Sequence, residues 1–340
     1  MASQRAQKIA VLVQEERERG LNKTEAYKRV ALSQGLKAKV VEMCFYRVEK
    51  ENPEVLAFDL NQIPPIEDVI FTDFKKISLT EKDRPRLAIC IGDHHVPYIS
   101  PFTVGVQLLW CKEFQPDEII FGGDFFDFYA VSNFDKNPAR LKRDRLTDEL
   151  NVGYSILKAF RDACPKANIT YIEGNHEARL FKYKIRNTPE VDGVKIAGTE
   201  LEPFTVKSLA RLDELNIRYI ESVKDESEVE IGGVWFGHWR NANRYSGYTI
   251  KNLLDRFMVP CIQNHVHRAG VHFRKVKTGM IQGRENPCSC LLTPEYLLNT
   301  DWQNGFTTIA WIEDNIIMET CIVDNGIAKW GDWIVEPRDI

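Results

Sequence analysis

The chain has 340 residues, of which 44% are hydrophobic and 28% are charged. This length and composition predict a globular protein with one large domain and a small one, or two domains, whose core needs no disulfides. No apolar stretch approaches the roughly 20 residues of a membrane span, and the charged N-terminal segment lacks the apolar block of a secretion signal. We therefore expect a cytoplasmic protein without a membrane partner.

Charge is distributed unevenly along the chain. Residues 1–50 carry 11 Lys and Arg against 6 Asp and Glu, whereas the remaining residues carry 34 against 43. A basic end attached to an acidic body indicates that the two parts have different roles.

Three short helices are predicted within residues 1–52, because apolar residues recur there at helical spacing. The first covers residues 4–19. The second follows a capping box formed by Asn22 and Glu25, and the third begins at Lys37. We expect this segment to be an independent all-helical module.

A glycine-bearing turn before the third helix resembles a helix-turn-helix module, in which the third helix contacts DNA. A helical docking or oligomerisation arm fits the same pattern. The basic side chains that would contact nucleic acid are Lys37, Lys39, Arg47 and Lys50.

Residues 53–85 are interpreted as a connector, because prolines and charges interrupt short apolar pieces. From residue 86 onward, short β-rich runs alternate with helical stretches, such as 102–114, 139–163 and 245–257, which is typical of an α/β domain. Turn residues between the last apolar runs indicate hairpins. Residues 86–340 are therefore predicted to form one α/β domain that ends in β-hairpins.

Polar residues gather directly after the predicted strands, where ligands bind in α/β sheets. Six of the seven histidines fall in these clusters, and only His272 lies outside them. Histidines that merely pack in a core would have no reason to concentrate there. The clusters are Asp93-His94-His95, Asp124-Phe125-Phe126-Asp127, Asn175-His176-Glu177, His238 and Asn264-His265-Val266-His267.

This mixture of carboxylate, imidazole and amide groups suits Mn, Fe, Ni, Co or Zn. The clusters hold too many ligands for one ion, so we expect two ions that share a carboxylate, as in phosphate ester hydrolysis. The absence of cysteine from the clusters argues against a structural zinc site. The eight cysteines are expected to be buried, reduced thiols, with a metal or redox role for Cys288 and Cys290 as the alternative.

The ordered motifs Asp-x-His, Gly-Asp-x-x-Asp, Gly-Asn-His-Glu, Gly-His and x-His-x-His resemble the calcineurin-like metallophosphoesterase superfamily over roughly residues 86–325. The resemblance implies a four-layer α/β/β/α sandwich, here with a small N-terminal helical module, and a dinuclear metal centre at one edge. It also implies hydrolysis by a hydroxide that bridges the two ions.

The resemblance implies a role for each clustered residue. The ligands of the first ion would be Asp93, His95 and His267, those of the second Asn175, His238 and His265, and Asp124 would bridge the two. His176 resembles the family's catalytic histidine, which Glu177 would orient, while Asp127 would support the ligands.

Two features of this chain bear on the comparison with the family. Asn264 stands where glycine commonly precedes the first histidine of the last motif, and Arg179 resembles the Ser/Thr protein phosphatase branch. Within the first motif, strand geometry that continued past Gly92 would direct Asp93 and His95 to one side and His94 to the other.

Two loops are expected to shape the substrate side. Aromatic residues in 125–134 either pack beneath the loop or stack on nucleobases. Arg240 and Arg244, together with Arg179, are candidate phosphate contacts. We expect a Mn-dependent phosphodiesterase, a nuclease acting on DNA, with a phosphomonoesterase as the alternative and a non-catalytic scaffold of the same fold ranked last.

Overall fold

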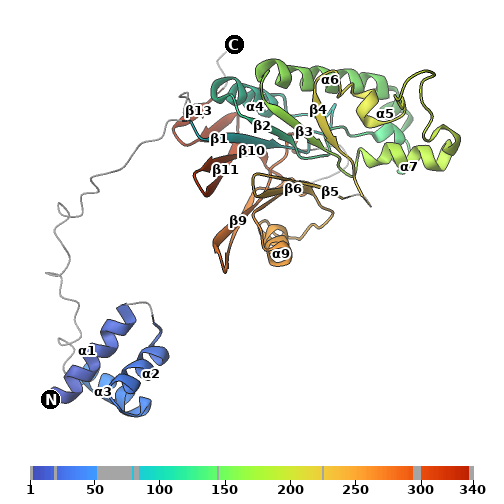
Figure 1. The fold of residues 1–340 in the computed structure, drawn as a ribbon. Helices are drawn as coiled ribbons and strands as arrows, with labels where there is room; N and C mark the ends of the chain where they lie inside the picture. The colour runs from blue at the N-terminus through green and yellow to red at the C-terminus, as the bar shows by residue number, and fades with distance from the viewer. Residues whose placement is uncertain are drawn as a thin grey trace. The chain divides into compact units, whose positions relative to one another are not determined.

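The computed structural model describes residues 3–18, 21–51, 79, 84–143, 145–223, 226–293 and 300–336. The chain divides into two compact units, Met1–Lys76 and Ile77–Ile340 (Figure 1). Most of the predicted connector 53–85 lies outside the described residues. None of the helices in the described ranges combines the length and apolar character of a membrane span.

The N-terminal unit contains the three predicted helices, α1 (Gln4–Glu18), α2 (Lys23–Ser33) and α3 (Ala38–Glu51). The predicted capping box is present, since the Glu25 amide donates to Asn22 Oδ1 at 3.0 Å. The apolar stripes of the three helices pack on one another around a small core that includes Ala10, Val30, Val41 and Phe45.

The larger unit is built on two sheets. The first has eight strands in the order β13-β12-β11-β10-β1-β2-β3-β4. Its parallel half consists of β1 (Arg86–Ile91), β2 (Glu118–Phe121), β3 (Asn168–Ile172) and β4 (Ile217–Ile220). The predicted hairpins form its antiparallel half, β10 (Asn304–Ile312), β11 (Asn315–Asp324), β12 (Ile327–Trp330) and β13 (Trp333–Val335).

The second sheet has five strands in the order β5-β6-β7-β9-β8. They are β5 (Ser227–Ile231), β6 (Val234–His238), β7 (Cys261–Gln263), β8 (Gly270–Val276) and β9 (Gly279–Glu285). Strand β7 runs parallel to both of its neighbours, β6 and β9, so the ends of β6 and β7 lie at the same edge.

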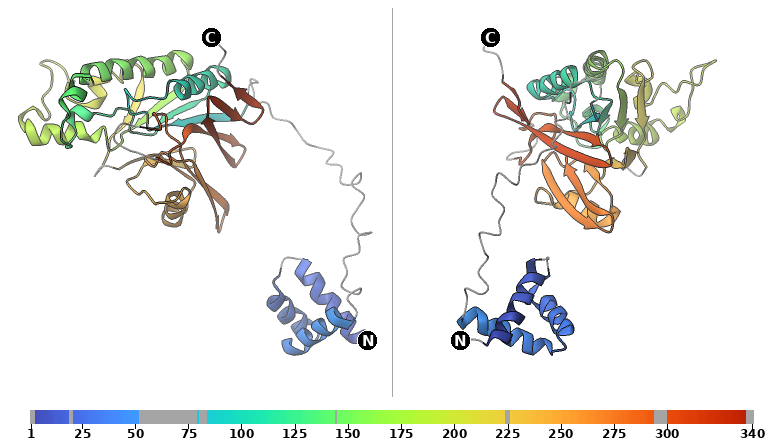
Figure 2. Two further views of the ribbon diagram at one scale, coloured as in Figure 1. Left: turned by 180° about the vertical axis from the view of Figure 1, so that it is seen from behind. Right: turned by 60° about the vertical axis from the view of Figure 1, so that its left-hand side comes forward.

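Helices cover the outer face of each sheet (Figure 1 and Figure 2). Helices α4 (Pro101–Phe114) and α6 (Leu146–Ala163) pack on the first sheet, and α9 (Tyr248–Phe257) packs on the second. A third apolar cluster fills the space between the sheets. The predicted α/β class and four-layer α/β/β/α order are therefore confirmed.

One helix prediction was wrong. Residues 139–163 form two helices, α5 (Pro138–Arg143) and α6, because the backbone at Arg145 is extended and starts a new helix. No glycine or proline marks this break in the sequence. The remaining short elements are α7 (Ala178–Asn187), α8 (Val206–Leu209), η3 (Tyr129–Val131) and η4 (Pro189–Val191).

Candidate dinuclear metal centre

The loops that follow β1, β2, β3, β6 and β7 meet at one edge of the two sheets. Backbone hydrogen bonds join them: the Asp93 amide donates to Gly123 O at 2.9 Å and the His95 amide to Asp124 O at 3.0 Å. The His265 amide donates to the Asp93 carboxylate at 3.1 Å, across a separation of 172 residues. Segments far apart in the chain are thereby fixed beside one another.

Three donor sets lie at this edge, and within each set one ligand atom per residue lies within 4.8 Å of the others. One set consists of His95, Asp127 and His176. The other two share Asp124 and consist of Asp93, His95, Asp124 and His267, and of Asp124, His238 and His265. Asn175 joins the last of these sets, because its Oδ1 lies 3.2 Å from His238 Nε2. The structure thus brings all seven predicted ligands together, while His272 lies on β8 outside all three sets.

The chemistry of the buried groups fits two divalent cations. Asp93 and Asp124 are 0% and 1% exposed, and buried carboxylates need a counter-charge. The Nε2 atoms of His95 and His267 face each other at 3.2 Å, an arrangement that a shared cation would favour. Oxygen and imidazole donors of this kind bind first-row divalent metals.

A hydrogen bond fixes which ring nitrogen of His238 is available. His238 Nδ1 lies 2.8 Å from Gly122 O, and because a carbonyl only accepts, Nδ1 carries a proton. Nε2 therefore faces Asp124 Oδ2, at 3.3 Å. Such a second partner sets the tautomer and orientation of a metal-binding imidazole.

Electrostatics at the site reflect close packing of opposite and like charges. Burial alone would lower the pKa of His238, but the Asp124 carboxylate raises it to about 10. Despite burial, the neighbouring imidazoles of His176 and His238 hold the pKa of Asp124 well below its usual range. Burial lowers the pKa of His95 and of His265 to about 4 in each case.

Most of these ligands have a backbone conformation that L-residues rarely adopt. Positive φ angles occur at Asp93 (51°), His95 (48°), Asp124 (47°), His265 (84°) and His267 (58°). Each such residue costs on the order of 1 kcal/mol, and the hydrogen bonds between the loops hold it in place. Strain concentrated on the donor residues is typical of a functional site.

These angles correct the strand argument made for the first motif. Strand β1 ends at Ile91, so strand alternation does not continue to His95. Asp93 and His95 still converge, but their left-handed backbone conformations bring this about. The His94 ring packs instead between Phe121 and Phe125, where burial lowers its pKa to about 3.

His176 borders the centre and is oriented by Asp127. Its Nδ1 lies 3.0 Å from the Asp127 carbonyl oxygen and 3.3 Å from the carboxylate. Arg179 donates to His176 Nε2 at 2.8 Å and to the Asp127 carbonyl at 2.7 Å. Arg140, which the sequence analysis did not single out, donates to the Asp127 carboxylate at 2.9 Å.

The expected orienting contact from Glu177 to His176 is replaced by a different one. The Glu177 carboxylate accepts hydrogen bonds from the backbone amides of Gly174, Asp124 and Phe126 and from the Tyr171 hydroxyl, at 2.7–3.0 Å. Four donors use the acceptor capacity of a carboxylate. Glu177 therefore clamps the Asp124 loop, and the position beside the imidazole belongs to Asp127.

The departure from glycine at position 264 has a local explanation. The buried Asn264 amide lies over Gly92 and Gly122, where an added Cβ would come within 2.7 Å and 2.2 Å of it. Asn264 Nδ2 donates to Gly237 O at 3.3 Å, and Asn264 Oδ1 accepts from Asn286 at 2.9 Å. Asn264, which follows β7 of the second sheet, is thus held there while it packs closely against Gly92 and Gly122, which follow strands of the first sheet.

Two cavities open beside the centre. One, of about 380 Å³, is lined by Asn133, Phe134, Asn175, Arg179, Lys182, Arg240 and His265. The other, of about 540 Å³, is lined by Asp127, Tyr129, Phe134, Asp135, Arg140, His176 and Arg179. Of the three predicted phosphate contacts, Arg179 lines both cavities and Arg240 one of them, but Arg244 lines neither. Lys182 was missed by the sequence analysis, although helix α7 places it one turn from Arg179.

The predicted DNA contacts of the N-terminal unit lie on or next to α3. Lys37 precedes the helix, and Lys39, Arg47 and Lys50 lie on it. Lys39 pairs with Glu42 at 2.8 Å and Arg47 with Glu51 at 3.1 Å. Exposed Met43 adds an apolar group to this surface. DNA contact by this helix stays a prediction.

No protein-family model matches the sequence, and no curated protein matches it. Solved structures with a similar arrangement include a single mutant of Vps29 from Entamoeba histolytica, at 12% identity over 72% of this chain and 96% of that one, with a TM-score of 0.36. A dimetal phosphatase from Danio rerio has 11% identity over 69% and 96%, with a TM-score of 0.37. The nuclease MPE from Pseudomonas putida has 13% identity over 65% and 83%, with a TM-score of 0.30.

The chain resembles the calcineurin-like metallophosphoesterases in its layers and in its ligand set. What the site can do chemically follows from its own donor sets, the His176–Asp127 pair and the adjoining cavities.

Proposed function

We propose that this chain is a metal-dependent phosphodiesterase and that its substrate is nucleic acid, DNA in particular. The observation that carries the proposal is the pair of donor sets sharing Asp124, next to His176 and two cavities that Arg179 lines. Two Mn²⁺ ions held by these residues would supply Lewis acidity and a water of lowered pKa.

The side chains around the centre have distinct tasks in this proposal. Because His176 Nδ1 is turned to a carbonyl, Nε2 is the nitrogen that can exchange a proton with the substrate. Arg179 now donates to that nitrogen, and a phosphate oxygen would attract its guanidinium and expose Nε2. Asp127 holds the imidazole in position throughout.

The shape of the site favours a diester over a monoester. Phe134 and Arg179 line both cavities, so the two spaces adjoin one another on either side of this pair. A phosphodiester continues on both sides of the phosphorus atom and could occupy both spaces, whereas a monoester needs one. Phe134 is 67% exposed and could stack on a nucleobase, which favours an unpaired strand.

A side-by-side assay tests the proposal. We expect Mn²⁺-dependent turnover of bis(4-nitrophenyl) phosphate and of single-stranded DNA, weaker turnover of duplex DNA, and the weakest turnover of 4-nitrophenyl phosphate. Faster hydrolysis of the monoester would favour the alternative, a phosphomonoesterase, in which Arg179 beside His176 would hold a terminal phosphate. Chain that binds no Mn²⁺ after reconstitution would instead support a non-catalytic scaffold.

Phe134→Ala tests whether nucleic acid is the substrate, independently of whether the chain hydrolyses phosphodiesters. Stacking contributes about 1–3 kcal/mol per base, so kcat/KM for single-stranded DNA should fall about tenfold while turnover of bis(4-nitrophenyl) phosphate stays unchanged. Phe181→Ala is the matched control, because Phe181 is also exposed but lines neither cavity beside the centre. Equal effects of the two substitutions on DNA would contradict a stacking role for Phe134.

The N-terminal unit would add affinity for DNA. Removing residues 1–51 should weaken DNA binding and flatten its salt dependence, because fewer phosphates are neutralised. Turnover of the small diester should not change. DNA affinity that is unaltered at every salt concentration would favour a protein-docking arm.

A further inference from the structure

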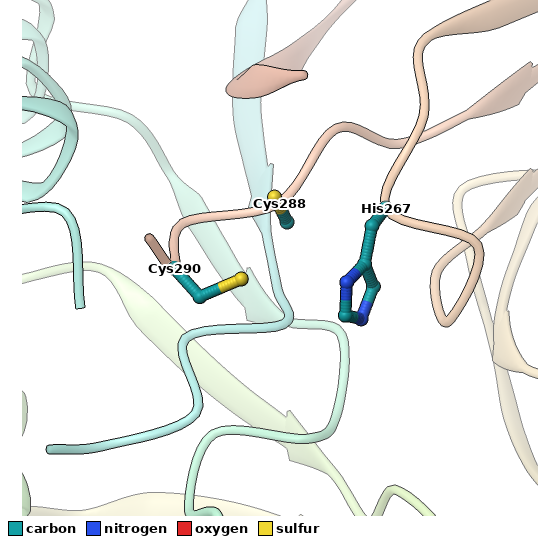
Figure 3. Close-up of side chains that lie close together, drawn as sticks. All are labelled: His267, Cys288 and Cys290. Atoms are coloured by element: carbon teal, nitrogen blue, oxygen red, sulfur yellow. The ribbon is translucent and has the colours of Figure 1, made fainter. Parts of the chain in front are cut away.

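A pair of thiols lies directly behind the dinuclear centre. Cys288 and Cys290 are 0% and 2% exposed, and both adjoin His267 (Figure 3). In Figure 3 the Cys290 side chain points toward the His267 imidazole. Neither sulfur atom belongs to the two donor sets that share Asp124.

The His267 ring has one nitrogen to spare. Its Nε2 faces the centre, 3.1 Å from Asp93 Oδ1 and 3.2 Å from His95 Nε2. Its Nδ1 is buried and has no hydrogen-bond partner among the described residues. Among the described residues, the Nδ1 atoms of His95 and His265 are likewise buried without a hydrogen-bond partner, but only His267 shares a donor set with cysteines.

Three donor atoms, one each from His267, Cys288 and Cys290, lie within 4.8 Å of one another. Their segment is held firmly on both sides. The Cys288 amide donates to Gln303 O at 2.9 Å, Asn304 Nδ2 donates to Cys290 O at 2.7 Å, and the Ser289 amide donates to Asp93 O at 3.2 Å. The thiols are therefore pre-positioned on the same framework as the ligands.

Cys288 Sγ also donates to Gln303 O at 3.3 Å, yet the surroundings of this pair differ from those of a second pair of buried cysteines. Cys111 and Cys164 are also buried and neighbouring, since Cys164 Sγ lies 3.2 Å from Cys111 O. They lie in an apolar cluster, and among the described residues no imidazole joins them in a donor set. Two sulfurs and one imidazole nitrogen make a softer donor set than that of the adjoining centre, and soft ligands select thiophilic ions.

We propose that His267, Cys288 and Cys290 form a third metal site, which takes a thiophilic divalent ion of the zinc class. Binding would form two metal–sulfur bonds and one metal–nitrogen bond. The two thiol protons and the Nδ1 proton would pass to solvent, and His267 would become an imidazolate. His267 would then connect this ion to the first ion of the dinuclear centre through its two ring nitrogens. The occupancy of one site would therefore affect the affinity of the other.

Titration with Cd²⁺ tests the site on the full chain, with Mn²⁺ already loaded. We expect a sulfur-to-metal charge-transfer band in the ultraviolet and one thiophilic ion bound per chain in addition to the two at the centre. In the Cys288→Ser/Cys290→Ser variant the band should vanish while the centre keeps two ions. The matched control, Cys111→Ser/Cys164→Ser, should keep the band.

X-ray absorption on the zinc-loaded, unmodified chain decides the matter should the variant fail to fold. Sulfur neighbours of zinc at about 2.3 Å would support the site, and a first shell of nitrogen and oxygen alone would overturn it. A charge-transfer band that persists in the Cys288→Ser/Cys290→Ser variant would also overturn it. Neither measurement depends on catalytic activity, so its outcome is separate from that of the proposed phosphodiesterase function.

Discussion

Strand β1 and the loop that follows it obey different rules, although they are adjacent in the sequence. Along β1, Leu87 and Ile89 pack beneath the helices, and Ala88 and Cys90 face the second sheet. The alternation ends within the loop, where Asp93 and His95 take up left-handed conformations. In a strand, the alternation of residues along the sequence decides which side chains pack on each face. The conformation of a loop depends instead on the other segments that it contacts.

Strand β1 and the loop after it also contribute to different properties, the strand to folding stability and the loop to metal binding. The side chains of β1 contribute mainly through apolar burial. The loop residues hold strained conformations and buried charges that only neighbouring loops and cations make favourable. Substitutions in the two regions should therefore damage different properties of the protein.

The largest effect is expected from Asp124→Asn, on the loop side of this comparison. Asp124 belongs to both donor sets, so we expect fewer than two Mn²⁺ per chain. Turnover should fall about 10³-fold or more, because bound ions supply several kcal/mol of charge stabilisation. Elemental analysis and a diester assay check this, with the exposed Asp162→Asn as the control. A variant that keeps both ions would remove Asp124 from its shared position.

His176→Ala should act on turnover alone. The loss of a positioned proton donor typically costs about 10²- to 10⁴-fold, and His176 belongs to neither of the two sets that share Asp124. We expect two bound Mn²⁺ and strongly reduced diester hydrolysis, with His272→Ala on β8 as the matched histidine control. Retained activity would show that the His176–Asp127 pair does no chemistry.

Ile89→Ala and His95→Ala test the comparison directly. Ile89 is fully buried in β1, so its truncation should lower the free energy of unfolding by about 2–5 kcal/mol. His95→Ala should affect metal-free stability far less and weaken metal binding instead. Urea unfolding of the metal-free proteins and Mn²⁺ titration measure both. The distinction between the regions would disappear if both variants lost stability equally.

The smallest effect concerns pH. Asp124 raises the pKa of His238 to about 10 in the metal-free protein, although burial opposes this, so the ring is protonated at neutral pH and a metal must displace that proton. Mn²⁺ affinity should therefore rise with pH between about 7 and 9, with proton release on binding. Calorimetry in buffers of different ionisation enthalpy measures this release, and a value of zero would contradict the charged pair.

The same pair should make metal-free stability depend on pH. The folded pKa of His238 lies above its ordinary value near 6.5, so the stabilisation is fully present below about pH 6.5 and is lost as the pH rises through about 10. Urea midpoints of the metal-free protein at pH 6 and pH 10 would show the decline. In His238→Gln this part of the pH dependence should be absent.

The sequence by itself determined the layers and the candidate ligand residues that cluster at one edge of the sheets. Alternating apolar residues predicted the strands, and histidines at strand ends predicted where ligands converge, because parallel strands place their carboxyl ends at one edge. The hairpin turns and the Asn22–Glu25 capping box were likewise predictable, since both depend on neighbouring residues. Local chemistry and a repeating backbone suffice for such features.

Only the tertiary structure decided how those residues work together. In the structure Asp127, and not Glu177, contacts His176. The ligand loops contain left-handed residues where strand alternation was expected, and the Cys288–Cys290 segment lies against His267. Each of these features results from contacts between loops that are far apart in the chain. Such contacts cannot be predicted from the residues of a single segment. The candidate ligand residues of this site could be predicted from the sequence, but the packing of the two sheets decides which side chains they contact.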